Sequence, residues 1–140
     1  MSSSSACKIE HFVFWETNAK YLSFIAYRMA DPRLRQITIK TGVVKRLTKE
    51  KTVCEKEVDQ QKARIERLKA EGKDEHVMRK EDEILQETLM MVPDAHRRLV
   101  KAYDDLSEYV KNESELHETK EYQAANETMK LAKEKIDTDY

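Results

Sequence analysis

The stretch from Ile84 to Leu106 constrains the fold of this chain most strongly, because residues suited to a core recur in it at steps of three and four. Such spacing places them on one face of an amphipathic helix that packs against other helices. We therefore predict a helical bundle with this segment at its centre. The inward positions are Leu85, Thr88, Val92, Ala95, Leu99, Ala102 and Leu106, and the same spacing continues to Tyr109.

Pro93 lies inside this stripe and allows two interpretations. A proline here removes one backbone hydrogen bond and collides with the carbonyl of Leu89, at a cost of ~3 kcal/mol. A new helix could begin at Pro93, but Val92 would then be its N-cap, and valine caps helices poorly. One helix bent at Pro93 is favoured, because the apolar stripe keeps its phase through the bend.

Composition favours long helices over strands. The 140 residues include only two glycines and two prolines, too few for the many turns of an all-β fold. No apolar run is long enough to cross a membrane. Cys7 and Cys54 form no C-x-x-C motif, so neither a disulfide framework nor a zinc site is expected, and a reducing compartment is the simpler interpretation.

The composition changes at Met29 and divides the chain into an N-terminal extension, residues 1–28, and one domain, residues 29–140. We predict that the domain is an all-α, elongated, antiparallel three-helix bundle, because short turns between long helices make antiparallel neighbours. The expected helices cover about residues 31–70, 74–111 and 114–136. The extension holds six of the ten aromatic side chains, and it is either a docking arm or, as we favour, a loosely packed appendage.

Short signals mark the ends of these helices. Asp31 and Pro32 provide an N-cap and a first helical residue. Gly72 follows the end of the first helix, and Ser114 is the expected N-cap of the third. The inward positions predicted for the first helix are Ile37, Val44, Leu47, Lys51, Cys54, Val58, Gln61, Ile65 and Leu68. Those predicted for the third are Leu116, Tyr122, Ala125, Met129, Ala132 and Ile136.

The sequence contains none of the common catalytic or cofactor-binding motifs. Two isolated glycines cannot form a phosphate-binding loop, and no His-Glu-x-x-His motif is present. The four histidines are scattered along the chain. We therefore expect no enzymatic activity, no cofactor and no metal site.

Charge is distributed unevenly along the chain. Residues 31–51 contain seven basic and two acidic side chains, whereas residues 104–140 contain five basic and eleven acidic ones. A basic helix can bind nucleic acid, but here no aromatic residue is interleaved with the basic ones. An acidic protein partner is the favoured interpretation.

A second stripe faces away from the predicted core. Counted at 100° per residue from Val44 and Leu99, the outward positions are Ile39, Gly42, Arg46, Lys49 and Val53 on the first helix and Met90, Arg97 and Lys101 on the second. These residues are either ordinary surface positions or a mixed apolar and basic contact surface for a partner. On the second interpretation, Gly42 lets the partner approach closely and Met90 adapts to its shape.

Several strings in this sequence resemble one known family, in the same order. They are Met29-Ala30-Asp31-Pro32-Arg33, Lys40-Thr41-Gly42-Val43-Val44-Lys45-Arg46-Leu47, Ile84-Leu85-Gln86-Glu87, Met90-Met91-Val92-Pro93-Asp94 and Arg97-Arg98-Leu99. They resemble the tubulin-binding cofactor A family over about residues 29–140. The resemblance implies a three-helix bundle without enzymatic activity that captures β-tubulin released from the cytosolic chaperonin. Chains of this family usually begin at the equivalent of Met29, so it implies nothing about residues 1–28.

On this resemblance we expect a cytoplasmic, cytoskeleton-associated chaperone for β-tubulin that acts as a monomer and works with the other tubulin-folding cofactors. Neither nucleic acid nor a membrane is an expected partner. The alternative is a structural coiled-coil adaptor without tubulin specificity, which would oligomerise through its own seam. Lys51 and Gln61 within that seam argue against a tight coiled-coil dimer.

Overall fold

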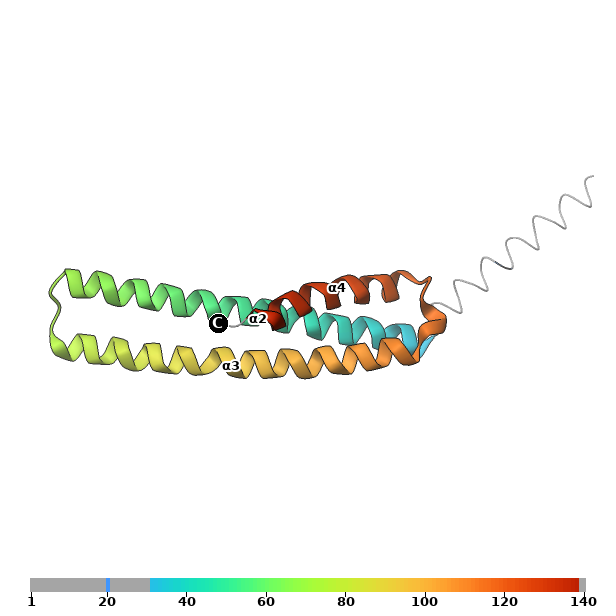
Figure 1. The fold of residues 1–140 in the computed structure, drawn as a ribbon, viewed down its shortest axis with the longest axis horizontal. Helices are drawn as coiled ribbons and strands as arrows, with labels where there is room; N and C mark the ends of the chain where they lie inside the picture. The colour runs from blue at the N-terminus through green and yellow to red at the C-terminus, as the bar shows by residue number, and fades with distance from the viewer. Residues whose placement is uncertain (1–19, 21–30, 139–140) are drawn as a thin grey trace, which may run out of the picture. The chain divides into compact units, whose positions relative to one another are not determined.

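The structure, a computed structural model, describes Lys20 and residues 31–138. The chain divides into two compact units, residues 1–35 and 36–140. Within the described ranges there are three α-helices, one short 3-10 helix and no strand, so the predicted all-α class is confirmed. The elements are α2 (Pro32–Ala70), α3 (Glu75–Asn112), η1 (Ser114–Leu116) and α4 (Lys120–Asp137), as Figure 1 shows. The predicted extension, residues 1–28, lies outside the described residues apart from Lys20, which is helical and exposed.

The start of α2 follows the predicted signal. The backbone N–H of Arg33 donates to Oδ1 of Asp31 at 2.9 Å, which satisfies one of the donors left open in the first turn of a helix. The guanidinium of Arg33 also pairs with the same carboxylate at 3.2 Å. Asp31 therefore caps α2, and Pro32 occupies the first helical position, where its missing N–H has no consequence.

Gly72 forms the turn between the two long helices. It has a φ of +69°, the left-handed conformation that glycine adopts without a Cβ penalty. The N–H of Lys73 donates to the carbonyl of Leu68 at 3.2 Å, and this bond satisfies one of the carbonyls left open at the end of α2. The chain reverses here, and α3 returns alongside α2 in the antiparallel direction (Figure 1).

Pro93 lies within a single helix. α3 runs without interruption from Glu75 to Asn112, so the interpretation in which a new helix begins at Pro93 is excluded. The proline is exposed, which places its ring on the side of α3 away from the core. The predicted bend at this residue stays a prediction.

The stripes predicted for α2 and α3 form the core of the second unit. Every predicted inward position of both helices is buried or half-buried, and Leu99 and Leu106 have no exposed surface. Burial of a leucine of this kind contributes about 1.5–3 kcal/mol. Cys54 and Val58 form a cluster with Val92 across the two helices. Burial raises the pKa of the Cys54 thiol, which keeps it a neutral, small core side chain, as predicted.

The third helix begins later than predicted, at Lys120 and not next to Ser114. Ser114 instead opens the 3-10 turn η1, and the helix is capped by Thr119. The hydroxyl of Thr119 accepts from the N–H of Tyr122 at 3.3 Å and donates to the carbonyl of Leu116 at 2.6 Å. Thr119 therefore joins the turn to α4 as its N-cap, whereas Ser114 is the first residue of η1 and does not cap α4.

The buried positions of α4 are small: Ala125, Thr128 and Ala132. Thr128 was not predicted, whereas Tyr122, Met129 and Ile136, which were predicted to be buried, are only half-buried. Small side chains let helix axes come close together, and α4 packs most closely against α3.

The end of α4 lies beside Lys51 of α2. The Lys51 ammonium donates to the carbonyl of Thr138 at 2.9 Å and to that of Lys135. Glu55 lies 3.6 Å from the Lys51 ammonium and 3.7 Å from that of Lys135. Beyond this point, within the described residues, the α2–α3 hairpin continues as two helices (Figure 1).

Candidate partner-binding surface

All eight residues predicted to contact a partner are exposed: Ile39, Gly42, Arg46, Lys49, Val53, Met90, Arg97 and Lys101. Two of the apolar ones show large exposed areas, with 50% of Val53 and 71% of Met90 accessible. At Gly42 no atom lies within 4 Å of the position that a Cβ would occupy, so the surface there is open. Their outward orientation was therefore predicted correctly, while their role in binding stays a prediction.

The structure groups part of this set with residues that were not predicted. A groove runs between α2 and α4, and it contains three of the predicted residues but none from α3. It is lined by Lys45, Arg46, Thr48, Lys49, Thr52, Val53, Lys56, Thr128 and Leu131. Leu131 was not predicted; its signal in the sequence is an apolar residue outside the inward positions predicted for the third helix.

The lining of this groove is more apolar than its residue names suggest. Val53 and Leu131 are exposed, at 50% and 60%, and present their side chains from the two helices. The hydroxyl of Thr48 donates to the carbonyl of Val44 at 2.8 Å. The hydroxyl of Thr52 donates to the backbone carbonyl of Thr48 at 3.0 Å. Threonine hydroxyls bonded to their own helix in this way leave their methyl groups for contact. Thr128 does the same on α4, with its hydroxyl 2.8 Å from the carbonyl of Ala124.

The charges of the groove all have one sign. Four of its side chains are basic, and no Asp or Glu is among its lining residues. Among the residues that the structure describes, none of the four cations forms an ion pair; they are Lys45, Arg46, Lys49 and Lys56. Unpaired cations beside apolar surface favour an acidic partner.

Two arginines of α3 are paired with carboxylates. Arg97 contacts Asp94 on its own helix at 2.7 Å, and Arg98 bridges to Glu50 of α2 at 2.6 Å. The hydrogen bond that the Arg98 guanidinium donates to Glu50 raises the pKa of Arg98. Arg97 is thus exposed as predicted, but its charge is partly neutralised by Asp94.

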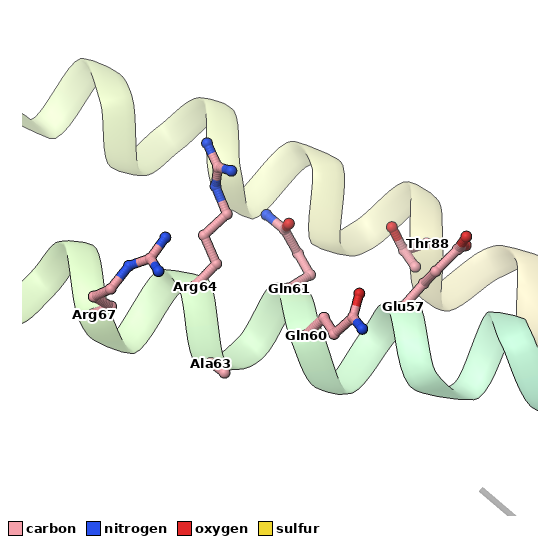
Figure 2. A pocket seen from close by; sticks show the side chains of 7 residues that line it. All are labelled: Glu57, Gln60, Gln61, Ala63, Arg64, Arg67 and Thr88. Carbon is pink, nitrogen blue, oxygen red and sulfur yellow. The ribbon is translucent and has the colours of Figure 1, made fainter.

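A second hollow lies along the two-helix part of the hairpin and is lined by Glu57, Gln60, Gln61, Ala63, Arg64, Arg67 and Thr88. Figure 2 shows Gln61 and Arg64 extending from α2 towards α3. Both contact the buried carboxylate of Glu81, at 2.7 Å and 3.1 Å. The hydrogen bond from Gln61 and the pairing with Arg64 lower the pKa of Glu81. The polar side chains of this hollow therefore hold the two helices together. The carboxylate of Glu57 in its lining would repel an acidic ligand.

Two kinds of site are absent from the described ranges. Between residues 31 and 138, and at Lys20, no group of three or more His, Cys, Asp or Glu side chains is arranged to hold a metal ion. The same residues include no helix that is long and apolar enough to cross a membrane.

Comparison with known proteins identifies the family. The family model described as tubulin binding cofactor A matches residues 32–129. The tubulin-specific chaperone A of Gallus gallus is 54% identical over 105 residues, which is 75% of this chain and 97% of the relative. The solved structure of human tubulin chaperone cofactor a superposes with a TM-score of 0.64 at 48% identity, covering 73% of this chain and 99% of the other. The structure of tubulin folding cofactor A from Arabidopsis thaliana gives 0.65 at 33% identity, over 74% and 97%. The family is one of binding and folding cofactors and not of enzymes, and this chain belongs to the tubulin binding cofactor A family.

Proposed function

We propose that this chain is a tubulin-folding chaperone that captures β-tubulin after its release from the chaperonin. It passes this client on for assembly of the αβ-tubulin heterodimer, in the cytoplasm and together with the other tubulin-folding cofactors. The observation that carries the proposal is the family match over residues 32–129, which includes both long helices. Relatives that share about half of their residues with this chain are named for action on tubulin.

The mechanism follows from exposed helix faces. The outward stripe on α2 combines apolar side chains with cations that are free to pair with an acidic client. Apolar contacts hold such a complex together, while the basic residues speed its formation and make it salt-sensitive. The sequence has no motif for nucleotide hydrolysis, so we assign release of the client to competition by the next partner.

The adaptor alternative loses support from the position of the seam. Val44, Lys51 and Val58, which would form the contact between coiled-coil chains, are fully or almost fully buried within one copy of this chain. In a monomer, these seam residues therefore already pack against other residues of the same chain. Analytical ultracentrifugation tests this point, because a stable oligomer at micromolar concentration would favour the adaptor.

The test of the proposed function is capture of purified β-tubulin by the full chain, with α-tubulin as the specificity control. Arg46→Glu combined with Arg97→Glu should weaken capture more at low salt than at high salt and leave the melting temperature unchanged. Because Arg97 is paired with Asp94, Arg46→Glu alone should account for most of the loss. Leu99→Asp places a charge in the core and should unfold the bundle first. If wild-type protein binds neither tubulin, the proposal is wrong.

A further inference from the structure

We propose that the groove between α2 and α4 is the docking site for one acidic amphipathic helix of the client, an inference that rests on the proposed function. The groove opens where α4 leans towards α3. Ala125 and Ala132 have no exposed surface, and α4 packs most closely against that helix. Leu131 of α4 lies on one wall of the groove and Val53 of α2 on the other.

A helix fits this groove better than an extended strand does. Its walls are two helices whose backbone donors and acceptors are used internally, so no open sheet edge is available to bind a strand. The threonine hydroxyls of the lining are bonded to their own helices, and the surface offers methyl groups to an apolar face. Helix-in-groove binding relies on apolar side chains at steps of three and four, which would lie along the strip between Val53 and Leu131.

The charges of the groove determine the character of that helix. Arg46, Lys49 and Lys56 stand at steps of three and seven along α2 and form a row of cations beside the apolar strip. A ligand helix with Asp or Glu flanking its apolar face would pair with this row, whereas a basic helix would be repelled. Stacking of nucleic acid bases needs aromatic side chains, and the groove lining has none.

Matched variants of the full chain test the groove. Val53→Asp is compared with Met91→Asp, since these side chains are exposed to almost the same extent, 50% and 51%. Lys49→Glu with Lys56→Glu is compared with Lys80→Glu with Lys111→Glu, two exposed positions on α3. The two groove variants should weaken tubulin capture about tenfold or more. The control variants should remain within about twofold of wild type. Melting curves for all four show that folding is intact.

The occupant is identified directly by photo-crosslinking. Leu131→benzoylphenylalanine should crosslink to an acidic helical segment of tubulin, identified by mass spectrometry, whereas Met90→benzoylphenylalanine should not reach that segment. A synthetic helical peptide with leucines on one face and glutamates on its flanks should bind wild type and compete with tubulin. Its lysine counterpart should not bind.

The outcomes separate the two proposals. If wild type captures tubulin and the groove variants capture it equally well, the groove inference fails and the proposed function stands. If wild type captures no tubulin, both fail. Crosslinks from position 131 to a basic or extended segment overturn the occupant. The inference is also overturned if the groove variants still capture tubulin but lose binding to a single-stranded RNA 20-mer or to phosphatidylserine vesicles.

Discussion

Lys51→Met tests the contact that fixes the end of α4 on α2. The Lys51 side chain is only 2% exposed and donates to two carbonyls at the end of α4, those of Lys135 in the last turn and of the C-cap residue Thr138. A lysine at a helix C-terminus also interacts favourably with the negative end of the helix dipole. Methionine matches lysine as far as Cε, with sulfur in place of Cδ, and lacks the ammonium, so the change removes the polar contacts and leaves a gap of only about one atom.

The expected loss follows from these contacts. A hydrogen bond from a charged group contributes ~1.5–3 kcal/mol, and removal of one partner of a buried ion pair costs ~3–5 kcal/mol. Both figures are reduced here, because Glu55 keeps Lys135 at 3.7 Å and the carbonyls at a helix end can be hydrated. We expect Lys51→Met to lower the free energy of unfolding by about 3 kcal/mol, which for a domain of this size is roughly 15 °C in melting temperature.

Urea denaturation measures the global effect, and hydrogen exchange followed by mass spectrometry locates it. Amides of α4 should exchange faster in the variant, while those of the distal hairpin, around residues 60–85, should change less. Lys56→Met is the control, since Lys56 is exposed and forms no ion pair among the described residues; surface changes of this kind cost within ~0.5 kcal/mol. Adding Glu55→Gln to Lys51→Met should recover part of the loss, because it removes the remaining buried carboxylate charge.

Two results would refute this reasoning. In the first, the free energy of unfolding of Lys51→Met lies within ~0.5 kcal/mol of the wild-type value, which is the range of a surface change. The buried ammonium would then make no net contribution to stability. Alternatively, stability could fall while exchange in α4 stays unchanged, and the lysine would then act elsewhere than at the end of α4.

Three further predictions concern other parts of the chain. Because the folded-state pKa of Glu81 is lowered, its contribution to stability is present above the unfolded value of about 4.3 and lost as pH falls through the lower, folded one. The stability difference between wild type and Glu81→Gln should therefore shrink in urea titrations between about pH 5 and pH 3, and a constant difference would contradict it. Pro93→Ala restores a backbone donor and should raise the free energy of unfolding by about 1–3 kcal/mol, whereas a loss would show that the packing needs the proline. Deleting residues 1–28 should leave helicity, melting temperature and tubulin capture unchanged, and a melting temperature lowered by more than ~5 °C, roughly one kcal/mol, would show that the extension packs on the bundle.

Local signals in the sequence were enough to place the long helices and their inward faces. The stripe from Leu85 to Tyr109, the Asp31 cap and the Gly72 turn each depend on residues within a few positions of one another. Their consequences therefore follow from helix periodicity and backbone sterics alone. For the same reason the phase of the stripe predicted that α3 continues through Pro93, as it does.

Only the tertiary structure decided where α4 begins and what lies beside it. Ser114 was the expected cap of the third helix, but the cap is Thr119, whose hydroxyl accepts from the N–H of Tyr122 at 3.3 Å. The burial of Lys51 depends on carbonyls more than eighty positions away in the chain. The groove arises in the same way, because Val53 and Leu131, far apart in the sequence, line it together only once α4 has packed on the bundle. Helical periodicity can be found within one segment of sequence. A groove or a buried charge, in contrast, depends on how segments that are far apart in the sequence pack together.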